Sequence, residues 1–232
     1  MNFNYNLQKS TGISFCDKKN FIEKFYFLTN KKNFKYFKNE YEGYKWYLSN
    51  IDNKALKNLK ILKKNKKINS LRIPIFEGKK YKFWKNVLNK QDLIETVVKH
   101  YRRTWSENKK IVPYHGDLTL SNIIFLKNKK IRIIDWEFFE KKQPWGLDIC
   151  NFFISLIALP ALAKKNNYIN DNDCLMFNFY WKSFFNNHQY EYLESPIEFL
   201  KKKTKLSNKN YLNKLSSKLE KKITYLIKNA NK

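Results

Sequence analysis

The stretch HGDLTLSN, residues 115–122, is the most informative part of this chain of 232 residues. Its aspartate, Asp117, and the asparagine five positions later, Asn122, have the spacing that a phosphoryl-transfer loop needs. A tight loop would let the carboxylate accept the proton of an attacking hydroxyl group while the asparagine faces a Mg²⁺ ion. The spacing therefore predicts a catalytic base and a metal ligand on one loop.

Two apolar segments follow this loop, and they read as a pair of strands. Residues 122–126 and 131–134 are rich in isoleucine and are joined by the polar turn at 127–130. The second strand runs directly into Asp135-Trp136-Glu137. A second metal carboxylate is expected at the end of this hairpin, and Asp135 stands there.

These segments resemble the aminoglycoside phosphotransferase and choline kinase superfamily. Its members carry HGDLxxxN, then a hydrophobic strand pair, then IDWE or IDFE, and this chain has HGDLTLSN at 115–122 and IIDWE at 133–137. Residues 146–153, GLDICNFF, are similar to the helix start D-[LI]-x-x-F that follows in the family. The resemblance implies an α+β, two-lobed protein-kinase-like fold with a reduced N-terminal β-sheet lobe and a mainly helical C-terminal lobe.

The same resemblance implies roles for individual residues. Asp117 would be the catalytic base, and Asn122 and Asp135 would be Mg²⁺ ligands. Glu137 would be a supporting carboxylate near the metal, and His115 would brace the loop through hydrogen bonds. ATP would be the phosphate donor and Mg²⁺ its cofactor.

The N-terminal part is expected to hold the nucleotide. Kinases of this type use a strand lysine that contacts the phosphates and a glutamate from the following helix that pairs with it. Residues 21–27 alternate as a strand and carry Lys24. Residues 39–48 are expected to form a helix; Glu40 fits the paired glutamate, with Glu42 as the competing choice.

A loop that covers the phosphates is expected at residues 10–14. Ser10 and Gly12 would contact the nucleotide there through hydroxyl and backbone N–H groups. The alternative interpretation of this stretch is a plain hairpin turn.

The remaining elements follow from apolar spacing and turn signals. A strand is expected at 70–76, a hinge turn at 77–79 and a Lys-rich connector at 53–69. A helix is expected at 92–105, before the catalytic loop. Beyond residue 137 the chain is expected to be all-helical, with helices at 147–163, 173–187, 196–203 and 210–229. Residues 1–78 would form the N-terminal nucleotide-binding lobe and residues 79–232 the C-terminal catalytic and substrate-binding lobe.

The formal net charge is +27, which raises the question of a nucleic-acid partner. The excess is almost all lysine, accompanied by many asparagine, isoleucine, phenylalanine and tyrosine residues, which is the bias of an AT-rich coding sequence. Arginine, the residue that reads bases most often, is scarce. Nucleic acid is therefore a disfavoured partner, although an anionic partner of another kind stays open.

Three cysteines, Cys16, Cys150 and Cys174, are far apart and do not form CxxC pairs, so neither a metal knot nor a disulfide framework is expected. The most apolar stretch, residues 149–163, is too short to cross a bilayer. The N-terminus has no charged start followed by an apolar run, so the mature chain is expected to begin near Met1. These features predict a cytoplasmic protein without a membrane span.

The expected acceptor is the hydroxyl group of a small molecule, choline- or ethanolamine-like, a sugar, or a cell-surface polysaccharide precursor. An aromatic box would suit a quaternary ammonium, but aromatic residues at helical spacing are more often core. The aromatic residues in question are Trp145, Tyr180, Trp181, Phe184 and Phe185.

Two other functions compete with this one. A catalytically weak kinase homologue would bind a nucleotide or another protein and act as a regulator, which the single glycine of the expected phosphate loop favours. A basic nucleic-acid-binding protein is the other alternative, supported by charge alone.

Overall fold

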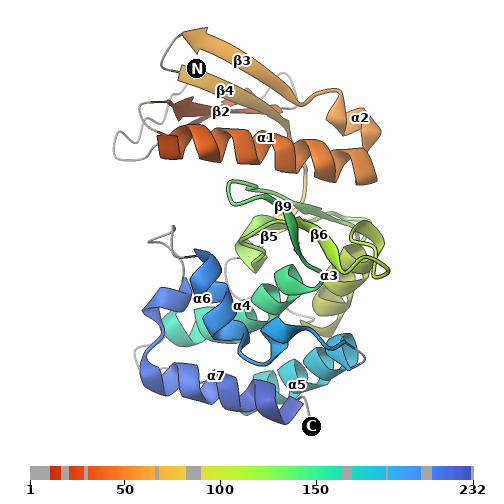
Figure 1. Cartoon of the computed structure of the whole chain (residues 1–232). Coiled ribbons are helices and arrows are strands. Elements are labelled where there is room, and N and C mark those ends of the chain that lie inside the picture. The colour runs from red at the N-terminus through yellow and green to blue at the C-terminus, as the bar shows by residue number, and fades with distance from the viewer. Residues whose placement is uncertain are drawn as a thin grey trace.

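A computed structural model gives the structure of residues 11–16, 21–28, 31–65, 68–81, 90–163, 169–186, 188–204 and 211–230. An antiparallel sheet and one long helix, α1, form the upper part of the molecule, and helices dominate the lower part (Figure 1). The chain therefore has the α+β, two-lobed protein-kinase-like fold with a mainly helical C-terminal lobe that the catalytic motifs predict.

The upper sheet has four antiparallel strands in the order β1-β2-β4-β3. Its strands are β1 (Thr11–Cys16), β2 (Phe21–Phe27), β3 (Lys60–Asn65) and β4 (Ile68–Pro74). Strand β2 confirms the prediction for residues 21–27. Lys24 and Tyr26 are buried and two positions apart, so they point to the same face of the sheet.

Two expectations for this sheet are wrong. The expected loop at 10–14 is a strand over its described part, because Thr11–Cys16 is β1 and Gly12 pairs with Phe25. Ser10 and residues 17–20 lie outside the described residues. Residues 60–65, expected within a connector, form β3, since an edge strand can pair on one side and keep its lysines in water.

Helix α1 (Lys31–Ile51) follows the sheet, and a short helix α2 (Asn53–Leu56) comes next. The helix begins at Lys31, not at Asn39 as expected, so Glu40 sits in its middle. Its buried residues recur every three or four positions: Asn33, Phe37, Glu40, Gly43, Tyr44, Tyr47 and Leu48. A Cβ atom on Gly43 would lie 2.6 Å from the Cβ of Trp136, so glycine lets the helix approach the segment after the catalytic hairpin.

A three-stranded sheet in the order β5-β7-β8 lies beneath α1. Its strands are β5 (Lys79–Lys80), β7 (Ile123–Phe125) and β8 (Ile131–Ile133). Strands β7 and β8 confirm the predicted hairpin. The chain bends at Gly78, where a Cβ atom would lie 2.5 Å from the backbone oxygen of Phe125. The lobe boundary after residue 78 stays a prediction.

One strand contradicts the expectation that the chain is all-helical after residue 137. Strand β9 (Glu140–Pro144) pairs with β6 (Ile111–Tyr114) in a two-stranded sheet. The sequence EKKQP has no apolar alternation, and the strand forms because β6 presents it with a partner. This pairing places the segment after Glu137 beside the strand that leads into the catalytic loop.

Helices build the rest of the molecule and confirm the predicted elements there with shifts of a few residues, most at the last helix. They are α3 (Lys90–Thr104), α4 (Leu147–Ala163), α5 (Asp171–Phe185), α6 (Pro196–Thr204) and α7 (Ser217–Ala230), with 3-10 turns at Leu120–Asn122, Glu191–Leu193 and Tyr211–Lys214. Helix α4 is buried over nearly its whole length and forms the centre of the core. None of the described helices is long and apolar enough to span a membrane.

Candidate active site

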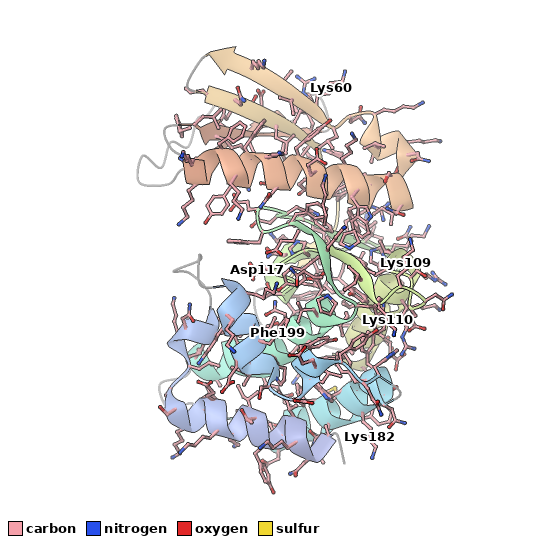
Figure 2. All side chains as sticks on the ribbon, viewed as in Figure 1. Lys60, Lys109, Lys110, Asp117, Lys182 and Phe199 are labelled. Carbon is pink, nitrogen blue, oxygen red and sulfur yellow. The ribbon has the colours of Figure 1, made fainter. Side chains whose placement is uncertain are left out.

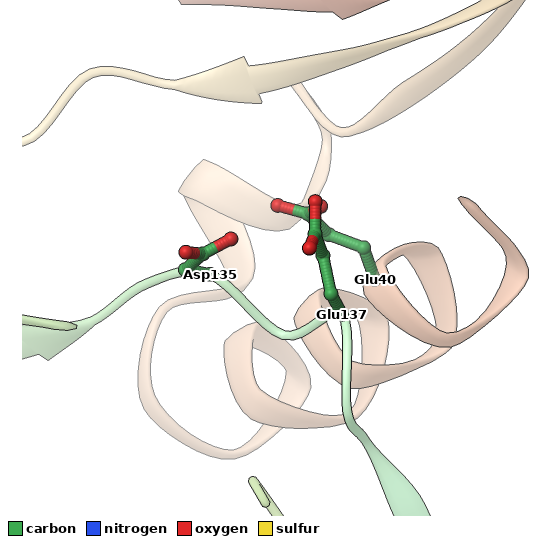
Figure 3. Close-up of side chains that lie close together, drawn as sticks. All are labelled: Glu40, Asp135 and Glu137. Carbon is green, nitrogen blue, oxygen red and sulfur yellow. The ribbon is translucent and has the colours of Figure 1, made fainter. Parts of the chain in front are cut away.

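The ammonium group of Lys24 lies among three carboxylates that come from two distant parts of the chain. Its Nζ is 2.7 Å from Oε2 of Glu40, 3.0 Å from Oδ1 of Asp135 and 2.8 Å from Oε1 of Glu137. One oxygen of each acid lies within 4.8 Å of the others. Figure 3 shows Glu40 on helix α1 and the two other acids on the segment that follows β8. The predicted lysine–glutamate pair is thus formed, and it touches the predicted metal carboxylates.

This cluster, Lys24 with Glu40, Asp135 and Glu137, holds more negative than positive charge. Burial raises the pKa of Glu40 to about 8, opposed by Lys24 and reinforced by the two other acids. Burial alone would lower the pKa of Lys24, but the three carboxylates raise it well above its usual value. Partial burial acts to raise the pKa of Asp135, but Lys24 outweighs it, and the pKa falls. The cluster can therefore accept a further cation.

Asp117 and Asn122 face each other across the catalytic loop. The Asn122 amide nitrogen donates to the Asp117 backbone oxygen at 2.8 Å and to its Oδ2 at 3.1 Å. Burial, together with Asp135 and Glu137, raises the pKa of Asp117 to about 7, and the bond from Asn122 acts in the opposite direction. A carboxyl group tuned toward neutral pH suits a general base.

His115 braces the loop, as the resemblance implies. Its Nδ1 accepts a hydrogen bond from the backbone N–H of Asp117 at 3.1 Å, so the proton is on Nε2, which donates to the carbonyl oxygen of Ile134 at 3.0 Å. Burial lowers the pKa of His115 to about 4, so the ring is neutral at physiological pH. The ring thereby joins the base to the segment after β8 that carries Asp135.

Asp148 is a buried acid that holds the backbone of the catalytic loop, and sequence analysis did not identify it as a site residue. Asp148, in the first turn of α4, accepts the backbone N–H groups of His115 at 2.9 Å and Gly116 at 3.1 Å. Burial raises its pKa to about 7 against these two hydrogen bonds. Its only sequence signal was its place in the stretch 146–153, because an acid in the first turn of a helix is common for electrostatic reasons alone.

The backbone of the loop takes a shape that only glycine adopts easily. Gly116 has a φ of +88°, and a Cβ atom there would lie 2.5 Å from the carbonyl oxygen of Phe138. This explains why glycine stands beside the base. It also packs the loop directly against the segment that follows Glu137.

Two tyrosines of α1 hold the segment that ends in Asp135. The hydroxyl of Tyr44 accepts the backbone N–H of Asp135 at 3.2 Å, and that of Tyr47 accepts the N–H of Ile133 at 3.0 Å. Asp135 has a φ of +69°, a conformation uncommon for residues other than glycine. The carbonyl oxygen of Asn122 also accepts the N–H of Ile134 at 2.9 Å. Both predicted Mg²⁺ ligands therefore lie at the same end of the β7–β8 hairpin.

The structure separates the two candidate helix acids. Glu40 pairs with Lys24 and is 1% exposed, whereas Glu42 faces the surface and lies 3.6 Å from Lys141. Glu40 is therefore the partner of the strand lysine. The nucleotide contacts predicted for Gly12 and Ser10 stay predictions.

The candidate aromatic box is part of the core. Each of its five residues is at most 7% exposed. The rings of Trp145 and Phe184 stack at 4.9 Å with an interplanar angle of 3°. These aromatic residues pack in the core around α4 and α5, as the alternative interpretation of their helical spacing predicts.

The donor set of the site fits Mg²⁺. Carboxylate oxygens of Asp135 and Glu137 and the amide oxygen of Asn122 are hard ligands of the kind that Mg²⁺ prefers. Asp135 has a side chain that is 47% exposed, so it can reach an ion held between protein and phosphate. Glu40 is the third acid of the cluster, but it is paired with Lys24 at 2.7 Å and is therefore not assigned as a metal ligand.

Comparison with known proteins matches the chain to one family model and to solved structures. A family model described as choline/ethanolamine kinase matches residues 41–230. No curated protein gives a significant match. Among solved structures, the chain is similar to that of WbdD, with 12% identity, a TM-score of 0.48 and coverage of 100% of this chain and 50% of the other. A second structure, described as the bifunctional kinase-methyltransferase WbdD, has 14% identity, a TM-score of 0.47 and coverage of 98% and 48%. The chain thus spans about half the length of these structures.

Proposed function

The chain belongs to the choline/ethanolamine kinase family, and from this premise we propose that it is an ATP-dependent kinase that transfers the γ-phosphate to a hydroxyl group of a small acceptor. The observation that carries the proposal is the contact of Lys24 with Glu40, Asp135 and Glu137. It joins a strand lysine and a helix glutamate to the metal carboxylates, as phosphoryl transfer requires.

Asp117 acts as the catalytic base in this proposal. The acceptor oxygen forms a bond to the γ-phosphorus, the bond from that phosphorus to the bridging oxygen breaks, and ADP leaves. The acceptor hydroxyl proton passes to the carboxylate of Asp117. Asn122 orients this carboxylate, and His115 and Asp148 position the loop that carries it. The protein contributes mainly position and charge.

Lys24 contacts the α- and β-phosphates, and Glu40 fixes the direction of its side chain. Asn122 and Asp135 hold Mg²⁺, with Glu137 as the supporting carboxylate. The ion neutralises charge on the phosphates when bound. We also propose that Gly12, which lies in β1, and Ser10, which lies outside the described residues, contact the nucleotide.

Calorimetric titration with ATP, with and without Mg²⁺, tests this function on the wild type and on Asp135→Ala. We expect binding that requires Mg²⁺ and that weakens strongly in the variant. Asp171→Ala is the matched control, because Asp171 is an exposed acid at the start of α5. Absence of ATP binding by the wild type would contradict the proposal and favour a role without catalysis.

A further inference from the structure

A cavity of about 390 Å³ opens beside the catalytic loop, and lysines line its rim. Its floor includes Gly116, the neighbour of the proposed base, and Glu137 of the cluster around Lys24. Figure 2 shows Asp117 beneath helix α1. A molecule in this cavity would therefore contact the glycine beside Asp117 and one acid of the Lys24 cluster.

Lysines reach this cavity from two separate parts of the chain. Lys31, Lys32 and Lys35 come from the start of α1, and Lys203 comes from the end of α6. All four are exposed, and none forms an ion pair with a carboxylate in the part of the chain that the structure describes. Helix α1 has no acidic residue in its first turn, so its positive N-terminal end adds to their charge.

Two carboxylates, those of Glu137 and Glu140, also line the cavity, and they balance only part of this charge because four lysines face two acids. Glu137 is paired with Lys24 at 2.8 Å, and Glu140 accepts a hydrogen bond from the Gln143 amide. The rings of Tyr36 and Phe138 meet edge to face at 5.5 Å and give the wall an apolar part. The cavity thus combines an apolar surface with unbalanced positive charge.

We infer that this cavity binds the acceptor and that the acceptor is an anion, a hydroxyl compound that carries a phosphate or carboxylate group. The inference rests on the proposed function and specifies its substrate class. Four ammonium groups repel a quaternary ammonium such as choline, whereas lysines bind phosphate and carboxylate as point charges. The acceptor's anionic group contacts the lysines, its carbon skeleton lies on Tyr36 and Phe138, and its hydroxyl faces Asp117.

Direct binding tests this inference without depending on turnover. The protein is first saturated with Mg²⁺ and a non-hydrolysable ATP analogue, so that added anions do not enter the nucleotide site. Glucose 1-phosphate, glucuronic acid, glucose and choline are then titrated separately by calorimetry. We expect at least one of the two anions to bind, with glucose and choline binding at least about tenfold more weakly. The two anions distinguish a phosphate from a carboxylate as the recognised group.

The double variant Lys35→Gln/Lys203→Gln removes one lysine from each side of the cavity. We expect it to weaken anion binding by roughly tenfold, because each exposed charge contributes modestly. The control Lys218→Gln/Lys221→Gln makes the same change in net charge on exposed positions of α7 and should leave binding unchanged. Thermal melting confirms that both variants are folded.

Three outcomes overturn the inference: choline binds as tightly as the anions, neither anion binds, or both double variants bind the anion equally well. A separate titration of Mg²⁺-ATP distinguishes this failure from failure of the proposed function. If the wild-type protein binds Mg²⁺-ATP but no anion, the proposed kinase function stands and only the inferred substrate class is wrong. Wild-type protein that fails to bind Mg²⁺-ATP loses the proposed function, and the anion titration, run without nucleotide, still reports on the cavity.

Discussion

The catalytic loop and the cluster around Lys24 are neighbours, yet different forces hold them. In the loop, hydrogen bonds hold the backbone and the histidine: His115 donates to Ile134, and Asp148 accepts two backbone N–H groups. In the cluster, three acids share one lysine. Hydrogen bonds within the protein therefore fix the backbone of the loop, whereas the cluster keeps surplus negative charge that a divalent cation can balance. The catalytic loop thus provides a fixed geometry, and the cluster around Lys24 provides a binding place for a cation.

The largest expected effect comes from the loop. Asp117→Asn keeps the size of the side chain but removes its capacity to accept a proton, so turnover with Mg²⁺-ATP and an accepted acceptor should fall by about 10³-fold. The fold should remain, because within the described ranges the Asp117 side chain accepts a hydrogen bond from the Asn122 amide of its own loop and from no other element. Steady-state ADP release measures the turnover, and circular dichroism measures whether the fold is retained. Asp171→Asn is the control, and retention of more than a tenth of wild-type turnover would refute Asp117 as the base.

Asp148→Ala should remove the support of the loop. Two buried N–H groups, those of His115 and Gly116, would lose their acceptor, which costs about 2–5 kcal/mol of unfolding free energy. Urea denaturation measures this loss. Asp148→Asn should restore part of it, since one amide oxygen can still accept. A change below about 0.5 kcal/mol in the alanine variant would mean that the loop is held in some other way.

How far the sequence predicts the molecule depends on whether the signal is local. The hairpin β7–β8 and the helix at 147–163 were predicted well because apolar spacing and a polar turn mark them without reference to distant residues. The site residues 115–137 form one such compact stretch. The structure brings these residues together with Lys24 and Glu40 as the family resemblance implies.

Elements that depend on a partner were not predictable in this way. Strand β9 has an exposed, charged sequence and exists because it pairs with β6. The first turns of α1 carry lysines where acids are preferred, so its start at Lys31 gave no signal. The bonds of Asp148 reach backbone groups more than thirty positions away, and nothing in a single sequence marks such a contact.

In the cluster, Lys24→Met should give a smaller effect that Mg²⁺ reverses. Removal of the ammonium leaves Glu40, Asp135 and Glu137 without a counter-charge, so the unfolding free energy in EDTA should fall by about 2–4 kcal/mol. Added Mg²⁺ should raise the melting temperature of the variant more than that of the wild type, because the ion then replaces the lost cation. Lys60→Met, on exposed strand β3, is the control. An equal Mg²⁺ effect in both proteins would show that the acids do not share a cation site.

The smallest expected effect is a pH dependence that belongs to the loop. Burial, Asp135 and Glu137 raise the pKa of Asp117 to about 7, above its unfolded value, so ionisation of this group costs stability as pH rises from about 4 to 7 and the full cost is present above 7. Asp117→Asn abolishes this cost. In EDTA, the variant should therefore gain about 1–2 kcal/mol over the wild type at pH 8 and much less at pH 5, after allowance for solvent screening. Urea denaturation at the two pH values measures the gain. A gain that is equal at both would mean that Asp117 is already ionised at pH 5, and that the neighbouring acids do not hold its proton.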